Sequence, residues 1–376
     1  MIPPFCPNKD CSLHRTDHPP SGWYIREGTY SSAIHHRIQR FRCTSCRTTF
    51  SSQTFSIDYM VKKPLSYRFI FQRLRATSGI RHIARDLGVS HKTVLNRCSR
   101  LARQALALHS SLHGHLSLVE DLVTDGFESF VGSQYFPNNI HLVVGKRSQY
   151  LYGLDYAHLR RKGRMSEAQK KRNLLLQAAD VSGKRSIAKS FEAVVRQIEE
   201  LVESRSAPGT TLFSDLRGEY VSVLNRSEYL RQKRHEGSFS HARISSKAPR
   251  TLSNHLFAVN YLDRQIRKDC ANHVRETVQF SRNVNSCMER LAIYRVYHNC
   301  CKPYRVDDMK KRELVHGQVA GLRREAIDRE LRGMFSRRRF LSRQRTLSEN
   351  DWLVWLRGLA TPLKRSSDYV PAYAWA

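Results

Sequence analysis

Three aspartates, Asp125, Asp215 and Asp263, stand where the chain is expected to pass from strand to turn or helix. Asp125 lies within an apolar, strand-like stretch, Asp215 closes another apolar run, and Asp263 begins a basic helical segment. Carboxylates held a few ångströms apart on rigid elements bind pairs of Mg²⁺ or Mn²⁺ ions, because hard oxygen ligands suit these cations. In such a site one ion activates a water or a 3′-hydroxyl and the other stabilises the leaving oxygen. The three aspartates therefore predict a two-metal site for phosphoryl transfer.

Each aspartate taken alone also has an ordinary structural explanation, since most aspartates are solvated turn or cap residues. Asp215 could cap the helix that follows it, and Asp263 could pair with Arg267 one helical turn further on. Asp269 lies on a different face of the same expected helix as Asp263 and is the alternative third member. Other nearby carboxylates are Asp121, Glu128 and Glu219.

The elements that must position these carboxylates follow from hydrophobic patterning. Residues 122–131, 140–145 and 149–154 show the alternation and the flanking turn residues of three strands. Residues 186–204 carry apolar side chains at helical spacing. Residues 210–214 then predict a fourth strand, which ends next to Asp215.

The remainder of this region predicts a helix at 217–224, a short strand near Tyr229 and mostly helical structure over 254–300. Three strands, a helix, a fourth strand and further helix form the order of an RNase H-like α/β domain, with a mixed sheet and flanking helices. We expect this domain to cover residues 118–305, and the carboxylates at the strand ends strengthen the assignment.

Four cysteines near the N-terminus are spaced as metal ligands. Cys6 and Cys11 form a Cys-x4-Cys pair, and Cys43 and Cys46 form a Cys-x2-Cys pair. Zinc prefers four tetrahedral ligands, and thiolates suit it. Because residues 1–58 are too polar to form a core of their own, a metal would hold them together as a zinc-ribbon domain. Alternative ligands are His14, His18, His35 and His36.

Residues 65–108 have the pattern of a helix-turn-helix domain that reads DNA. Apolar residues recur on one face of an expected first helix, Gly88 permits a tight turn, and Val89 fills the core. Ser90 is a good N-cap for the second helix. This arrangement leaves a set of polar and basic side chains of the second helix free for base edges and phosphates: His91, Lys92, Thr93, Asn96 and Arg97.

Composition limits the class of protein. The 376 residues carry a formal net charge of +31 spread along the chain, which favours a polyanionic partner and nucleic acid first. With 40% hydrophobic residues the chain can form a packed core. No apolar run is long enough to span a membrane and no secretory signal is visible, so we expect a cytoplasmic protein, acting on the bacterial nucleoid if the resemblance below holds. The nine cysteines are then reduced or metal-bound.

Over residues 118–305 the chain resembles the DDE/D transposases of small bacterial insertion sequences, especially those with an N-terminal zinc ribbon and helix-turn-helix. The resemblance rests on the strand with Asp125, on Phe-Ser-Asp-Leu-Arg-Gly-Glu-Tyr around Asp215, and on a final segment. That segment has Asp-Arg at Asp263, Arg-x-Thr-x-x-Phe-Ser at 275–281 and Tyr-x-Asn at 297–299. In such families an acidic residue followed by Arg starts the last catalytic helix, and that residue is commonly Glu where this chain has Asp263.

The resemblance implies a metal-dependent enzyme that binds the ends of a mobile DNA element and performs DNA cleavage and strand transfer. Asp125, Asp215 and Asp263 would be the catalytic ligands of Mg²⁺ or Mn²⁺, with Zn²⁺ as a structural metal. The partners would be element-end and target DNA and further copies of this chain, with no membrane. Basic residues at 160–172, and Arg264, Arg267 and Lys268, would contact phosphates.

Residues 306–376 lie outside the resemblance and are expected to form a basic, helical C-terminal extension. Its end, 346–376, carries Trp352 and Trp355 and is expected to pack back onto the rest of the chain. The alternative function is a non-catalytic DNA-binding protein, such as a domesticated transposase or a regulator. That alternative needs the zinc ribbon and the helix-turn-helix but not the three carboxylates.

Overall fold

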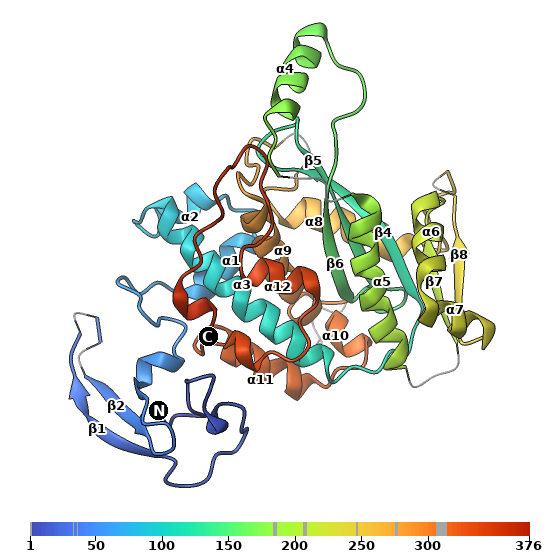
Figure 1. Cartoon of the computed structure of the whole chain (residues 1–376). Coiled ribbons are helices and arrows are strands. Elements are labelled where there is room, and N and C mark those ends of the chain that lie inside the picture. The colour runs from blue at the N-terminus through green and yellow to red at the C-terminus, as the bar shows by residue number, and fades with distance from the viewer. Residues whose placement is uncertain are drawn as a thin grey trace.

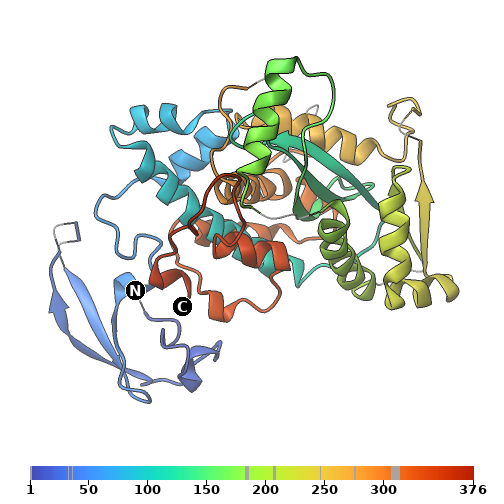
Figure 2. The same cartoon turned by 45° about the horizontal axis from the view of Figure 1, so that its top comes forward.

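The structure is a computed structural model, and the residues that it describes are 2–32, 34–35, 37–182, 186–205, 209–245, 247–274, 277–305 and 314–376. A small antiparallel sheet lies at one end of the molecule, a group of helices in the middle and a larger sheet beyond them (Figure 1). The turned view shows the small sheet set apart from the helices and one helix projecting from the body (Figure 2). The two chain ends lie near each other beside the small sheet.

The larger sheet contains β4 (Leu122–Phe130), β5 (Pro137–Gly145), β6 (Leu151–His158), β7 (Thr210–Ser214) and β8 (Phe239–Arg243). Its strand order is β6-β5-β4-β7-β8. β4, β5 and β6 are antiparallel neighbours, whereas β7 runs parallel to β4, and β8 runs parallel to β7. The expectation of an α/β fold with a mixed sheet is confirmed.

The sheet separates two apolar layers, because successive side chains of a strand point to opposite faces. On one face Val123, Phe127 and Leu142 pack with α8 (Phe257–Asp269) and α9 (Val284–Cys300). On the other face Leu122, Val143 and Leu212 belong to the cluster that includes α5 (Ile187–Glu203) and α6 (Gly218–Arg226). The first of these faces is the one that bears Asp125, which is two residues from Val123 and from Phe127.

The prediction of a short strand near Tyr229 is wrong. Tyr229 lies in α7 (Glu228–His235), and the strand comes later, as β8. Ser227 caps this helix by accepting a hydrogen bond from the Leu230 N–H, and three basic residues occupy its last turn. Both features stabilise a helix, the basic residues by interacting with the negative end of its dipole.

Helices α1 (Tyr67–Arg75), α2 (Ile80–Asp86) and α3 (His91–His113) form the middle of the molecule. The turn between α2 and α3 contains Gly88 in the left-handed region, at φ 60°. The hydroxyl of Ser90 accepts a hydrogen bond from the Thr93 N–H, so its expected role as N-cap of α3 is confirmed.

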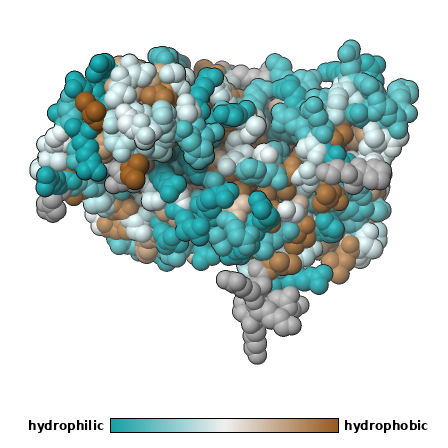
Figure 3. All heavy atoms as spheres, turned by 90° about the horizontal axis from the view of Figure 1, so that it is seen from below, coloured by the Kyte–Doolittle hydropathy of each residue, from teal (hydrophilic) through white to brown (hydrophobic). Residues whose placement is uncertain are grey.

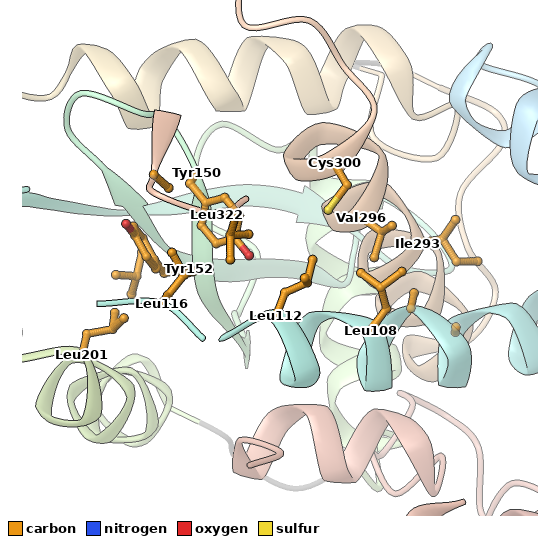
Figure 4. Packing of buried hydrophobic residues seen from close by; sticks show 14 of the residues in the cluster. Leu108, Leu112, Leu116, Tyr150, Tyr152, Leu201, Ile293, Val296, Cys300 and Leu322 are labelled. Atoms are coloured by element: carbon orange, nitrogen blue, oxygen red, sulfur yellow. The ribbon is translucent and has the colours of Figure 1, made fainter. Parts of the chain in front are cut away.

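Helix α3 continues beyond the expected helix-turn-helix into the main core. Leu108 and Leu112 of α3 pack near Ile293, Val296 and Cys300 of α9 (Figure 4). The same cluster reaches strands β5 and β7. The segment expected to form a separate DNA-binding domain at 65–108 therefore shares one hydrophobic core with the sheet.

The described C-terminal residues, 314–376, fold back onto this body. They contain α10 (His316–Val319), α11 (Arg324–Met334) and α12 (Glu349–Trp355), and the last two pack against α3. Trp355 is only 1% exposed, and its indole N–H donates to the Ala374 carbonyl. This part of the expected extension is integral to the core rather than an appendage; residues 306–313 lie outside the described residues.

The N-terminal region contains an antiparallel sheet of β1 (Tyr24–Tyr30), β2 (Ile38–Cys43) and β3 (Thr49–Ser51). Its core is a small aromatic cluster that includes Trp23, Phe41 and Phe50. Short 3₁₀ helices occur here and near the C-terminus, at Ser12–His14, Ser52–Phe55, Leu341–Arg343 and Ala372–Ala374.

The helix that projects from the body is α4 (Glu167–Ala178) (Figures 1 and 2). Its only buried side chain is Asn173, and Leu174 and Leu175 are exposed. The underside of the molecule is mostly hydrophilic, with hydrophobic residues in small scattered groups (Figure 3). None of the helices in the described part of the chain is both long enough and apolar enough to cross a membrane.

Candidate active site and metal centre

Asp125 and Asp215 lie at matching positions of two neighbouring parallel strands. The β4–β7 ladder pairs Val123 with Phe213, and each aspartate follows two residues after its member of that pair. Neighbouring strands are about 4.8 Å apart, and residues two apart on a strand share one face. Both carboxyl groups therefore leave the sheet side by side, at the carboxyl end of β7 and on the face covered by α8.

Asp263 approaches the same place from α8, which packs against β4 and β5. One turn further along this helix, the Arg267 guanidinium lies 4.6 Å from the ring centre of Phe127 and donates to the Glu128 carbonyl at 2.8 Å. Residues four apart share a helix face, so Asp263 lies on the face of α8 that covers β4. The structure thus brings all three predicted aspartates to one side of the sheet.

The electrostatics of these carboxyl groups show that they are close and incompletely compensated. Burial raises the pKa of Asp263 to about 8, and the negative charge of Asp125 adds to the rise. Burial raises the pKa of Asp125 to about 6, and Asp215 adds to that rise. Among the described residues, no hydrogen-bond donor meets the buried Oδ1 atom of Asp263. An unpartnered buried carboxylate oxygen facing another carboxylate is the arrangement that a cation would stabilise.

Arg217 provides part of the counter-charge. Its backbone N–H donates to Asp215 Oδ1 at 3.0 Å and its Nε donates to Oδ2 at 3.3 Å. Its Nη2 atom lies 3.6 Å from Glu128 Oε1. The N-cap of α6 is Arg217 itself, so Asp215 does not take the capping position that was its alternative explanation.

Two arginines near the carboxylates were not singled out in the sequence. Arg217 stands two residues after Asp215, so the Asp-x-Arg spacing could have indicated it. The charge of Arg250 lowers the pKa of both Asp125 and Asp263. Arg250 is far from Asp125 in sequence and precedes the helix of Asp263, and no local pattern marks it.

Two of the alternative carboxylates, Asp269 and Asp121, are placed elsewhere. Asp269 pairs with Lys302 at 2.7 Å and accepts a hydrogen bond from the Tyr294 hydroxyl. Asp121 precedes β4 and accepts the Thr211 N–H, at the opposite end of the strands from Asp215. Glu128 and Glu219 are exposed.

The second candidate site is the set of four cysteines predicted to bind zinc. The sulfur atoms of Cys6, Cys11, Cys43 and Cys46 all lie within 4.8 Å of one another. The Cys6–Cys46 and Cys11–Cys43 sulfur distances are 3.5 and 3.9 Å. A tetrahedral zinc with Zn–S bonds of about 2.3 Å requires sulfurs about 3.8 Å apart. This cluster can therefore hold a structural zinc ion as it stands.

The surroundings of the cysteines determine the pKa values of their thiols and show whether His14 is a ligand. Burial raises the pKa of Cys6 and of Cys43. Burial would also raise the pKa of Cys46, but hydrogen bonding with Thr48 outweighs it and lowers that pKa to about 6. His14 is not a ligand: its ring nitrogens contact the Cys6 carbonyl at 2.7 Å and the Ser342 hydroxyl at 2.8 Å.

Neither His18 nor His35 belongs to the cysteine cluster, and His36 lies outside the described residues. In the described part of the chain, the four cysteines are also the only group of three or more His, Cys, Asp or Glu ligands gathered closely enough for one ion. The three aspartates therefore do not form a single-ion site in this conformation.

The residues predicted to read DNA lie at the start of α3. His91, Lys92 and Asn96 are exposed and Thr93 is half-buried. Arg97 is different, because it is 5% exposed and its guanidinium donates to the Asn96 side chain at 2.9 Å and the Lys63 carbonyl at 2.8 Å. As placed, Arg97 anchors the start of α3 to the loop that precedes α1.

This chain matches no protein-family model, and a search of curated proteins found none similar to it. Of the motifs behind the family resemblance, Arg275 and Glu276 lie outside the described residues. In the Tyr-x-Asn motif, Asn299 accepts the Leu151 N–H and donates to the Leu151 carbonyl, which joins α9 to β6.

The substitution Asp263→Asn is expected to stabilise the fold in buffer without Mg²⁺ or Mn²⁺, and more at pH 8 than at pH 5. Asp263 has a pKa of about 8 in the folded chain and about 3.9 when unfolded. Between these values the folded state binds the extra proton, so the contribution of Asp263 to stability falls as pH rises. We expect a difference of about 1–3 kcal/mol in the free energy of unfolding between the two pH values.

Urea unfolding of the wild type and of Asp263→Asn at both pH values measures this difference. Asp269→Asn is the matched control on the same helix. It leaves Lys302 without its carboxylate partner and should destabilise the fold at both pH values. An equal effect of Asp263→Asn at pH 5 and pH 8 would contradict the burial of the Asp263 carboxyl group.

Proposed function

We propose that this protein is a DDE/D-type transposase, which binds the ends of a DNA element and performs metal-dependent cleavage and strand transfer. The observation that carries the proposal is the convergence of three carboxylates. Asp125 and Asp215 leave neighbouring parallel strands side by side, and Asp263 meets them from the helix that covers that face.

The sheet supports an RNase H-like fold for this part of the chain. Three antiparallel strands in sequence are followed by a crossover through α5 to a fourth strand, which lies parallel beside the first. β8 then adds in parallel at the outer edge of β7. In that arrangement the first strand and the end of the fourth strand are adjacent, which is where this chain has Asp125 and Asp215.

We propose that the three aspartates hold two Mg²⁺ or Mn²⁺ ions rather than one. When bound, such ions would activate the attacking hydroxyl and stabilise the leaving oxygen. Asp125, which interacts electrostatically with both Asp215 and Asp263, would contribute a ligand to both ions. Ions in such pairs lie about 3.5–4 Å apart, so Asp215 and Asp263 need not share one ion. This explains why the aspartates need not be gathered into a single-ion cluster.

The basic residues around the carboxylates would receive the phosphodiester. Arg217 and Arg250 carry positive charge toward them. Arg264 and Lys268 are exposed on α8. Their role would be to hold the DNA backbone while the carboxylates bind the ions. The remaining positive charge of the chain, +31 in total, favours DNA approach from any side.

The helix-turn-helix segment and α8, the helix that carries Asp263, are joined by a direct contact. The Thr77 hydroxyl, in the turn before α2, donates to the Lys268 carbonyl of α8 at 2.9 Å. Thr77 has φ 58°, a conformation that β-branched residues rarely adopt. DNA bound by α3 would therefore lie at a set position relative to Asp263. Strand transfer joins DNA ends, so we infer that two or more copies of the chain act together.

The rival proposal is a DNA-binding protein without catalysis. The observation in its favour is that Asp215 already has partners in Arg217, whose guanidinium pairs with it and whose backbone N–H donates to it. A site that no longer binds metal ions would keep the Arg217–Asp215 ion pair. In an active site, Asp215 would have to release part of this contact in order to bind an ion.

Incubation of the purified chain with labelled duplexes from the DNA that flanks its gene tests both proposals. A transposase should cut these duplexes and join them to a target plasmid only when Mg²⁺ or Mn²⁺ is present. If the chain binds the duplexes but cleaves them with neither Mg²⁺ nor Mn²⁺, the proposal of a non-catalytic DNA-binding protein stands. The absence of any DNA binding would remove both proposals.

Lys92→Ala is expected to weaken DNA binding, whereas Arg97→Ala is expected to destabilise the fold. Lys92 is exposed, so its loss should weaken DNA binding and reduce the salt slope by about 1 if it contacts a phosphate. Arg97 is buried, so its loss should lower the free energy of unfolding by about 1–3 kcal/mol, because the Lys63 carbonyl loses its donor. Fluorescence anisotropy and urea unfolding of both variants separate the two effects. A specific loss of base discrimination in a stable Arg97→Ala variant would show that Arg97 reads DNA directly.

A further inference from the structure

A cleft of about 740 Å³ lies between the N-terminal region and the C-terminal segment. One wall comes from residues near the cysteine cluster, including Phe5 and Asp17, and another from the end of α3. The third wall is formed by residues 337–346. The charged side chains lining it are Asp17, Arg337, Arg338, Arg339, Arg343 and Arg345.

Some of these arginines hold the walls of the cleft together. Arg343 pairs with Asp17 at 2.6 Å, bonds the His14 carbonyl and lies 4.1 Å from the ring centre of Phe5. Arg338 lies over the rings of Tyr59, Phe340 and Tyr373 and donates to the Tyr373 carbonyl. The shape of the cleft therefore depends on contacts between the two ends of the chain, and it is not an incidental gap.

Two other arginines in the cleft, Arg337 and Arg345, do not hold its walls together. Arg337 and Arg345 are exposed, and no ion pair joins either of them to another described residue. Burial, and to a smaller extent the charge of Arg345, lowers the pKa of Arg343 against the effect of Asp17. With five arginines and one aspartate, the lining carries excess positive charge, and a cleft lined by one sign of charge concentrates its field on an opposite partner.

Two further hollows adjoin the cleft, and the three together are called the groove below. A second hollow, containing Arg15, shares Asp17, Arg343 and Arg345 with it. A third hollow of about 670 Å³, beside the small sheet and containing Arg40, shares Arg338. Basic residues thus continue across the junction of the N-terminal region and the body. This extent exceeds what a small anion needs and suits a polymer of phosphates.

We propose that this groove binds the phosphodiester backbone of duplex DNA, as a contact separate from the one made by α3. The proposal rests on the proposed function, because that function makes DNA the polyanion. It assigns a role to the segment 337–346, which the family resemblance does not cover. It also explains why the four-cysteine region is docked on the C-terminal segment, since both supply a wall.

The test compares two double variants of the full-length, zinc-loaded chain in fluorescence anisotropy with a labelled duplex at several salt concentrations. Arg337→Ala with Arg345→Ala should reduce the slope of log affinity against log salt by about 2. The control, Arg329→Ala with Arg332→Ala, removes the same charge from exposed positions of α11 outside the cleft. It should leave the slope close to that of the wild type.

A photo-crosslinking residue introduced at position 345, but not at position 329, should attach to the labelled duplex. Equal salt slopes for the two double variants, together with equal crosslinking from positions 345 and 329, would overturn this inference while leaving DNA binding by α3 intact. Crosslinking to RNA of the same sequence in preference to the duplex would also overturn it. If the wild type bound no DNA at all, the proposed function would fail first, and this inference with it.

Discussion

Asp125→Asn and Asp215→Asn are each expected to reduce DNA cleavage and joining by about 10³-fold or more, with little change in DNA affinity. Loss of a single group that stabilises transition-state charge typically costs about 10²–10³-fold, and these residues would also position the ions. Asparagine keeps the size of the side chain but removes the negative charge that a divalent ion needs. The reading residues of α3 lie on another element, so binding should persist.

A second measurement tests the same carboxylates without relying on activity. Mn²⁺ should raise the thermal stability of the wild type, because an ion that binds only the folded state shifts the unfolding equilibrium. In Asp125→Asn and in Asp215→Asn, Mn²⁺ should raise the thermal stability by less than it does in the wild type. Asp328→Asn, an exposed carboxylate on α11 paired with Arg324, is the control and should behave as the wild type does. Unchanged cleavage in Asp125→Asn would remove the catalytic proposal.

Replacement of zinc ligands is expected to have the largest effect on structure. Wild-type protein should contain one zinc per chain, and Cys43→Ser with Cys46→Ser should contain almost none, since two of four thiolates are lost. Structural zinc contributes about 10–16 kcal/mol to the folding of small domains. The aromatic cluster around Trp23 and Phe50 is too small to replace that contribution. We expect the N-terminal region to become sensitive to protease.

The zinc prediction has a matched control in the same chain. Cys301 is a half-buried cysteine at the end of α9, remote from the cluster, and Cys301→Ser should keep one zinc. The main unfolding transition should survive in the double variant, because the core that joins α3, α9 and the sheet includes none of the four cysteines predicted to bind zinc. Full retention of zinc after loss of Cys43 and Cys46 would show that the metal is bound elsewhere.

Local patterns in the sequence were sufficient to predict the strands and helices that carry the candidate site. Alternating apolar residues predicted β4 and β7, helical spacing predicted α5, and the chemistry of Ser90 predicted the start of α3. The cysteine spacing predicted the metal cluster, because four thiolates in a polar segment have few other uses. These features depend on neighbours within a few residues, or on a ligand set whose number and type are themselves diagnostic.

Local patterns were not sufficient where two local preferences competed. The apolar residues around Tyr229 suit a strand, yet the Ser227 cap and the basic last turn place them in α7. A composition rich in arginine suggested an extension after residue 305. The buried Arg295–Asp351 pair, at 2.6 Å, and Trp355 show that its described part belongs to the core.

The choice among candidate site residues was decided by tertiary structure alone. Asp263 and Asp269 share a helix, and only the packing of α8 on β4 turns the first toward Asp125 and the second toward Lys302. Arg97 looks free in the sequence, but the Lys63 carbonyl binds it. Sequence determined which residue types were present and which elements held them. The faces they present depend on contacts between segments far apart in the chain, which no local pattern encodes.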